Sequence, residues 1–271
     1  FSGKIHIETI QSEKAVYYLP YHTAEVNVCK NLINLANYEY NLPEEDILKI
    51  LSQTESESSI ELTDMQKEAV IQAALNGVMV ITGGPGTGKT TIIRTIIRIF
   101  EKMNKTILLC APTGRAAKRI TQSTDREAKT IHRMLEYAYG EDDSNLCFNK
   151  NEDSPLDCDV LIVDEMSMVD ILLMNNLLKA LKPGTRLIMV GDVDQLPSVG
   201  AGNVLSDIIN SNVIKTIKLD KIFRQSMGSM IVQNAHEINK GNMIIFNKRD
   251  TDFFLMRENS NAGVINLIVD L

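Results

Sequence analysis

The stretch Gly83-Gly84-Pro85-Gly86-Thr87-Gly88-Lys89-Thr90 decides the fold of this chain. The apolar run 78–81 precedes it, and in residues 91–100 the apolar side chains recur with helical period. A strand, a glycine-rich loop and a helix in that order are typical of a phosphate-binding loop. Backbone N–H groups then surround phosphate oxygens, Lys89 reaches the β and γ phosphates, and Thr90 offers its hydroxyl to Mg²⁺. A glycine-rich turn without a ligand would leave the Lys-Thr pair unexplained.

Length and composition bound the class of protein. The 271 residues are 44% apolar, enough for one large or two ordinary domains. No apolar run approaches the roughly 18 to 20 residues of a membrane span, and residues 1–4 lack the order of a signal peptide. We therefore expect a soluble, cytoplasmic protein without membrane contact, and the first residue, Phe1, suggests a piece of a longer chain.

The cysteines and the first two histidines do not suggest a metal site. The four cysteines form no Cys-x-x-Cys pair and have no histidine at metal spacing, so we expect reduced thiols and no structural zinc. His6 and His22 also lack a second His, Cys or carboxylate at ligand spacing. Both are expected to be surface or core residues.

The net charge of −7 at first argues against a nucleic-acid partner, but the charge is unevenly distributed. Residues 102–133 contain two acidic residues, Asp125 and Glu127, and eight basic ones: Lys102, Lys105, Arg115, Lys118, Arg119, Arg126, Lys129 and Arg133. A solvated helix face is the usual reading of such a run. Because this run follows the phosphate loop closely, we favour contact with a nucleic-acid backbone.

The N-terminal part is predicted to form a small separate region. Short β-like patterns at 5–7 and 15–19 precede a helix from about Tyr21 to Tyr38 with one apolar stripe. Residues 44–59 are rich in acidic residues and serine, and we expect a short helix that leads into a flexible linker. The expected domains are residues 1–60, residues 61–220 and residues 221–271.

Several residues beyond the loop are candidates for binding or chemistry. Gln66 stands at capping-box spacing from Thr63, and its amide could equally pair with an adenine edge. The apolar strand 160–163 ends in Asp164-Glu165, which is typical of a metal-binding Asp followed by a Glu that polarises water. After the next strand, Gln195 could sense the γ phosphate; an ordinary acidic turn or loop is the alternative at each position.

Two segments after the phosphate-loop helix combine hydroxyl and basic groups. One contains Pro112, Thr113 and Arg115 directly after a predicted strand, and the other contains Thr130 and His132. Ligands of α/β proteins bind at the carboxyl ends of the strands, where such groups can contact a phosphate backbone. From the residues alone, His132 could equally be a core or surface histidine.

The order of these motifs resembles that of RecD-type superfamily 1B DNA helicases, the family of the exodeoxyribonuclease V alpha subunit. The resemblance covers residues 60–240 and rests on these motifs: Leu62-Thr63-x-x-Gln66, Gly84 to Thr91, Ala111 to Ala117, Thr130-Ile131-His132, Val163 to Met168, Val190 to Gly200, and Leu219-x-x-Ile222-Phe223-Arg224-Gln225. It implies an α/β fold, a RecA-like P-loop NTPase domain with a mostly parallel, doubly wound sheet. A small α-rich segment would precede this domain, and an incomplete second RecA-like domain would follow it.

The resemblance also assigns roles to matching positions. It implies ATP and Mg²⁺ as cofactors, bound by Gln66 at adenine, by the loop Gly84, Pro85, Gly86, Thr87, Gly88, Lys89, Thr90 and Thr91, and by Thr90 and Asp164 at the metal. Glu165 would be the catalytic base, Gln195 would couple nucleotide state to DNA, and Arg224 would approach the γ phosphate. Pro112, Thr113, Arg115, Thr130 and His132 would contact single-stranded DNA.

The implied activity is ATP-driven 5′ to 3′ movement on single-stranded DNA in recombination and repair, with nuclease or helicase subunits as partners in the family. A small hairpin used to split strands is implied near residues 136–159. Because the second motor domain looks incomplete, we expect residues 1–271 to be monomeric and to hydrolyse ATP slowly by themselves. A nucleotide-gated DNA-binding or assembly module without unwinding is the alternative, and a P-loop kinase fits the Asp-Glu pair and Gln195 less well.

Overall fold

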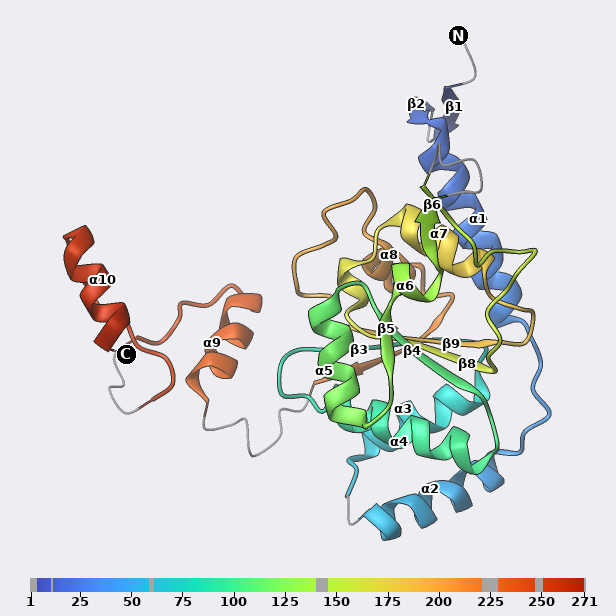
Figure 1. Cartoon of the computed structure of the whole chain (residues 1–271), viewed down its shortest axis with the longest axis horizontal. Helices are drawn as coiled ribbons and strands as arrows, with labels where there is room; N and C mark the ends of the chain where they lie inside the picture. The colour runs from blue at the N-terminus through green and yellow to red at the C-terminus, as the bar shows by residue number, and fades with distance from the viewer. Residues whose placement is uncertain are drawn as a thin grey trace. The chain divides into compact units, whose positions relative to one another are not determined.

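A computed structural model of the chain describes residues 4–10, 12–58, 61–139, 146–220, 229–246 and 251–270 (Figure 1). By their contacts the residues form two compact units, Phe1–Gly84 with Gly88–Asp220, and Pro85–Thr87 with Lys221–Leu271. The first unit extends across residue 60, where the sequence predicted a domain boundary. In the part of the chain that the structure describes, no helix is long and apolar enough to cross a membrane.

The first unit is built on a six-stranded sheet in which every pair of neighbouring strands is parallel. The order is β10 (Lys215–Leu219), β3 (Val78–Gly83), β9 (Arg186–Gly191), β8 (Val160–Val163), β4 (Ile107–Ala111) and β5 (Ala128–Thr130). β3 and β9 are buried along their whole length, as expected for central strands covered on both faces. The predicted α/β class with a parallel sheet is confirmed.

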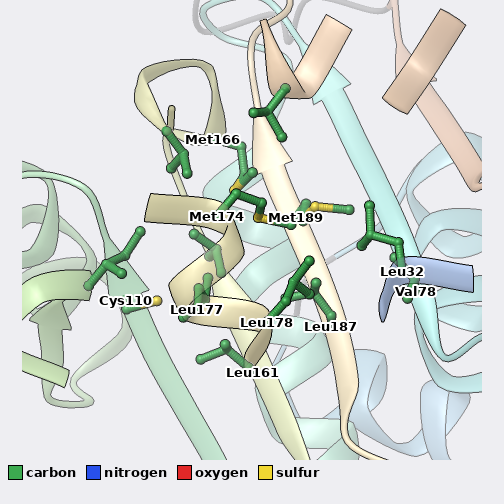
Figure 2. Close-up of a cluster of buried hydrophobic side chains, with 14 of the residues drawn as sticks. Leu32, Val78, Cys110, Leu161, Met166, Met174, Leu177, Leu178, Leu187 and Met189 are labelled. Atoms are coloured by element: carbon green, nitrogen blue, oxygen red, sulfur yellow. The ribbon is translucent and has the colours of Figure 1, made fainter. Parts of the chain in front are cut away.

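Helices cover both faces of this sheet, and the alternation of side chains along each strand divides the core into two clusters. Val78 and Val80 of β3 face one cluster, and Met79 and Ile81 face the other. The first cluster, shown in Figure 2, packs the sheet against α1 (Leu19–Ala36), α6 (Ile131–Met134), α7 (Ile171–Lys179) and α8 (Val204–Ser211). The second packs it against α2 (Glu44–Ser58), α3 (Asp64–Leu75), α4 (Lys89–Lys102) and α5 (Gly114–Thr124).

The helix predicted within residues 44–59 is present, but the flexible linker predicted to follow it is wrong up to Ser58, because α2 continues through the serine- and glutamate-rich run to that residue. Its buried residues Ile47, Leu51 and Thr54 recur at helical spacing and face the core. Glu55 and Glu57 form ion pairs with Lys67 of α3 and Lys102 of α4. Composition alone suggested disorder, but tertiary contacts stabilise the helix.

α1 carries the predicted buried stripe and ends close to the start of β3. A Cβ built on Gly77 would lie 1.9 Å from the backbone oxygen of Leu35 in α1. α3 ends directly before Asn76, whose backbone N–H donates to Gln72 O at 3.0 Å. Gly77 is therefore required by the close approach of α1.

Two small antiparallel pairs lie outside the main sheet. β1 (Ile5–Ile10) pairs with β2 (Glu13–Tyr18) before α1, as the sequence suggested. β6 (Tyr137–Tyr139) pairs with β7 (Leu146–Phe148) within the expected insert. A role of this second pair in splitting strands stays a prediction.

The second unit contains α9 (Met230–Asn239) and α10 (Asn261–Asp270). Ser229 caps α9 by accepting the N–H of Val232, and Asp252 accepts the N–H of Met230 at 2.6 Å. Arg224, expected near the γ phosphate, lies outside the described residues.

Candidate nucleotide-binding site

The candidate residues come together because the carboxyl ends of parallel strands share one edge of a sheet. β3 ends at Gly83, where the glycine-rich loop begins, and β8 ends directly before Asp164. β9 lies between them and ends directly before Asp192. Three separate segments thus deliver a loop and two carboxylates to one edge, the place where open α/β sheets bind ligands.

The loop itself needs glycine at two positions. Gly86 and Gly88 have φ of 75° and 86°, in the left-handed region that side chains with a Cβ disfavour. Gly88 caps the N-terminus of α4, and Lys89, Thr90 and Thr91 form the first turn. Free N–H groups and the positive end of the helix dipole therefore meet at this turn, which favours an anion.

Lys89 occupies a partly buried position in front of the loop. Its Nζ donates to the backbone oxygens of Gly83 and Gly84, the latter at 3.1 Å. Burial lowers the pKa of Lys89, while the carboxylates of Asp192, Asp164 and Glu165 act in the opposite direction. The lysine is thus a desolvated cation beside acidic groups, ready to exchange carbonyl partners for phosphate oxygens.

Asp164 is a desolvated carboxyl group at the end of β8. Burial raises its pKa, and the Glu165 N–H, which donates to Asp164 Oδ1 at 2.9 Å, acts against this shift. The Asp164 N–H donates to Cys110 O of β4 at 3.0 Å and fixes the backbone. A cation close to such a carboxylate stabilises its charged form. Together with the Thr90 hydroxyl, the carboxylate offers the hard oxygen ligands that Mg²⁺ prefers.

Glu165 has a strained backbone and a charged neighbour. Its φ of 56° is uncommon for a residue with a side chain. Its carboxylate lies 3.7 Å from Arg119 of α5, whose side chain is 74% exposed. Backbone strain of this kind costs about 1–3 kcal/mol and clusters at functional sites.

The sequence reasoning missed Asp192, which is only 3% exposed. Its carboxylate accepts the Asp194 N–H at 3.1 Å, and the next residue, Val193, donates its N–H to Thr82 Oγ1 of β3 at 3.2 Å. Asp192 is also the carboxylate with the largest influence on the pKa of Lys89. The available signal was similar to that for Asp164, an aspartate directly after a buried strand whose last five residues carry no charge.

Gln195 and Gln66, two other predicted nucleotide contacts, differ in their surroundings. The Gln195 side chain is exposed, and the backbone N–H of this residue donates to Asp192 O at 3.2 Å. Gln66 is buried, and its Oε1 accepts the Thr63 N–H at 3.0 Å, which confirms the capping box. An adenine contact by Gln66 stays a prediction.

The two predicted DNA-contacting segments are neighbours. Ala111 at the end of β4 pairs with Thr130 at the end of β5, so the two segments leave the sheet side by side. The hydroxyls of Thr113 and Thr130 accept N–H groups of the following helical turns at 3.2 and 3.1 Å. Both threonines therefore also shape the backbone.

Arg115 is exposed on α5, and His132 is exposed in a ring cluster with two aromatic residues. The imidazole centroid lies 5.5 Å from Tyr137 of β6 and 5.8 Å from Phe148 of β7. Flat exposed rings of this kind can stack on unpaired bases.

The basic stretch is less positive than its sequence suggests. Four of its eight basic residues form ion pairs: Lys102 with Glu57, Lys105 with Asp159, Arg119 with Glu165, and Arg126 with Glu101. Arg115, Lys118 and Arg133 are exposed. The usable positive charge is therefore concentrated on α5 and at α6.

Comparison with known proteins agrees with this geometry. The model of the AAA domain family matches residues 66–201, half of the chain. The chain is 41% identical over 180 residues to the ATP-dependent RecD2 DNA helicase of Deinococcus radiodurans, which aligns with 66% of this chain and 24% of the relative. It is 36% identical over 203 residues to the RecBCD enzyme subunit RecD of Mycobacterium tuberculosis, with 66% of this chain and 34% of the relative aligned.

A solved structure of the Pif1 helicase from Candida albicans is also similar, with 26% identity, a TM-score of 0.49, and coverage of 68% of this chain and 45% of that one. The chain spans about a quarter to a third of the length of the two curated relatives. The matched residues 66–201 include the glycine-rich loop, Lys89, Asp164 and Glu165. The chain therefore belongs to the AAA domain family and is RecD-like in sequence over this domain.

Proposed function

We propose that this chain supplies the ATP-hydrolysing motor domain of a RecD-type DNA helicase that moves 5′ to 3′ on single-stranded DNA. The observation that carries the proposal is the convergence of Lys89, Asp164 and Glu165 at one sheet edge beside a glycine-rich loop. Membership of the family implies nucleotide binding. One curated relative is named as an ATP-dependent DNA helicase and the other as a subunit of the RecBCD enzyme, which supports a cytoplasmic role in repair with subunit partners.

Each residue has a defined task in the proposed hydrolysis. The loop N–H groups and Lys89 hold the β and γ phosphates, with Gln66 and Thr91 completing the nucleotide contacts. Thr90 and Asp164 hold Mg²⁺, which when bound neutralises charge on the phosphates. Glu165 accepts a hydrogen bond from the attacking water and then takes its proton. Gln195, on an exposed loop, responds to the γ phosphate.

The same sheet edge supports coupling to DNA. Pro112, Thr113 and Arg115 follow β4, and on the neighbouring strand β5 Thr130 is the last residue and His132 lies just beyond it. Asp164 follows β8, the other neighbour of β4, so a change at the γ phosphate lies one strand away from the proposed DNA contacts. This adjacency favours DNA binding whose strength depends on the bound nucleotide.

Strand separation decides between a motor and a nucleotide-gated binding module. The intact protein, as the cell makes it, is given a fluorescent duplex with a 5′ single-stranded tail, and strand release is followed with ATP. Release that requires hydrolysis and a 5′ tail supports the helicase. ATP hydrolysis and DNA binding without strand release would favour the binding module.

Replacing Lys89 by Ala tests the phosphate site. Loss of one charge-assisted contact costs on the order of 1.5 to 3 kcal/mol, so the Kd for ATP should rise about tenfold or more. Titration with a fluorescent ATP analogue measures the Kd. Lys102→Ala at the other end of the same helix is the matched control, because Lys102 pairs with Glu57 and should leave the Kd unchanged. Equal affinity of the Lys89 variant and the wild type would refute the assignment.

Replacing both Arg115 and Lys118 by Ala tests the DNA surface. Basic groups that neutralise phosphates release counterions, so the slope of log K against log salt should flatten by roughly one to two units. The double variant Lys102→Ala/Lys105→Ala is the control, since both lysines are ion-paired. Fluorescence anisotropy with labelled single-stranded DNA at several salt concentrations gives the slopes. If the two double variants have the same slope, α5 is a solvated face.

A further inference from the structure

We propose that His6, Glu8 and His22 form a binding site for a divalent transition-metal ion of the Zn²⁺ type, which fastens the β1–β2 hairpin to the start of α1. One potential ligand atom from each residue lies within 4.8 Å of the other two. The three side chains are neither fully buried nor fully exposed, so an ion can reach them. This site is independent of the proposed ATPase function.

The fold brings the three residues together in a way that their spacing concealed. His6 and Glu8 are two positions apart in β1, and alternation along a strand places them on the same face. His22 lies in the first turn of α1, and the N–H of Leu19 at the start of that helix donates to Lys4 O at 2.9 Å. The hairpin and the helix are therefore anchored to each other next to the cluster. The sequence spacing of His6 and His22 indicated no ligand partner, but the fold brings both close to Glu8.

The imidazoles of His6 and His22 already face each other. Their ring centroids are 3.8 Å apart with an angle of 24° between the planes. Tyr17 stands opposite His6 in the strand pair, and its ring centroid is 5.2 Å from that of His22. The two rings thus lie against an aromatic side chain with their nitrogens close to one carboxylate.

This donor set fits a particular class of ion. Two imidazole nitrogens and one carboxylate oxygen are a common ligand set for Zn²⁺ and for similar metals, with a fourth position left for water. Bonds of about 2.0–2.1 Å place tetrahedral ligand atoms about 3.4 Å apart, so the side chains must rotate from their present positions to close the site. Because the lone pairs lie in the ring planes, binding must also open the stack.

A neighbouring residue supports the carboxylate. A hydrogen bond between the Tyr17 hydroxyl and Glu8 is the main reason why the pKa of Tyr17 is raised. Outer partners that orient metal ligands commonly increase affinity. Tyr17 therefore lies next to Glu8 at the edge of the proposed site.

The ion would have a structural effect. A two-stranded hairpin has little stability of its own in water, and the Ile7 and Val16 side chains are 54% and 63% exposed. One metal bridge between β1 and α1 adds a constraint that the few apolar contacts do not supply. We therefore expect the hairpin to be more ordered with the ion than without it.

The test is a Co²⁺ titration of the metal-free chain in excess Mg²⁺, read from the visible absorption of tetrahedral cobalt and from competition by Zn²⁺. We expect one ion per chain, and at least about a tenfold weaker affinity in His6→Ala and in His22→Ala. His132→Ala is the matched control, an exposed histidine outside the cluster. Circular dichroism checks that each variant is folded. Hydrogen exchange of residues 4–18 should slow on addition of Zn²⁺ in the wild type and not in His22→Ala.

Two outcomes would overturn the proposal. One is a Co²⁺ affinity that is the same in folded His6→Ala, His22→Ala and wild-type chains, or no binding at all. The other is loss of the signal in Cys29→Ser or Cys147→Ser, because these exposed thiols would then be the ligands.

Discussion

Glu165→Gln should bind ATP as the wild type does and hydrolyse it about 10² to 10⁴ times more slowly. Gln keeps the size and the hydrogen-bonding oxygen of Glu165 but cannot take a proton, and a positioned base typically contributes this factor. The contact with Arg119 would also lose its charge, but the arginine is 74% exposed, so stability should change little. Binding and chemistry are thus separated in one variant.

The measurement combines a fluorescent-nucleotide titration with a coupled phosphate-release assay, with and without single-stranded DNA. Glu152→Gln is the control, because Glu152 is exposed on the loop after β7. Its turnover should equal that of the wild type. Turnover of Glu165→Gln near the wild-type rate would mean that another residue, such as the buried Asp192, activates the water.

Gly77→Ala should destabilise the first unit by about 3 kcal/mol, which lowers Tm by roughly 6–12 °C. The new Cβ would lie 1.9 Å from Leu35 O, a backbone atom that no rotamer change can move. Shifting Gly77 away is also costly, because its own carbonyl accepts the N–H of Leu187 in β9 at 2.8 Å. The clash must therefore move either α1 or the start of the central strand.

Gly114→Ala is the matched control for this prediction. A Cβ on Gly114 meets nothing within 4 Å, and the residue begins α5, where Ala is favourable. Its Tm should stay equal or rise slightly in thermal unfolding followed by circular dichroism. Similar Tm values for the two variants would show that α1 can move away from the start of β3 with little loss of stability.

The central part of the fold could be predicted because its signals are local. The apolar runs of β3, β8 and β9 and the helical period of α4 are written in short windows of sequence. The same holds for Asp164 and Glu165, which directly follow β8, and for Lys89, which begins α4. The strand order could not be predicted, because nothing in the sequence of β3 indicates that β9 and β10 are its neighbours.

The errors arose where tertiary contacts outweigh composition. The Ser52–Ser58 run looks disordered, but Thr54 is buried and Glu57 pairs with Lys102 across 45 positions of sequence. β10 was not predicted because its Lys-Thr-Ile-Lys-Leu sequence is that of a half-exposed edge strand. The cluster of His6, Glu8 and His22 depends on a hairpin and a helix meeting, which no fixed spacing reveals.

The parallel sheet also constrains how the chain can fold while the ribosome makes it. β3 leaves the exit tunnel long before its partners, since Thr82 and its hydrogen-bond donor Val193 are 111 positions apart. At bacterial and eukaryotic rates of about 5–20 residues per second, this interval lasts on the order of 5 to 20 s. During that time a six-residue apolar strand has two unpaired edges, which makes nascent chains that stall before β9 natural clients for chaperones.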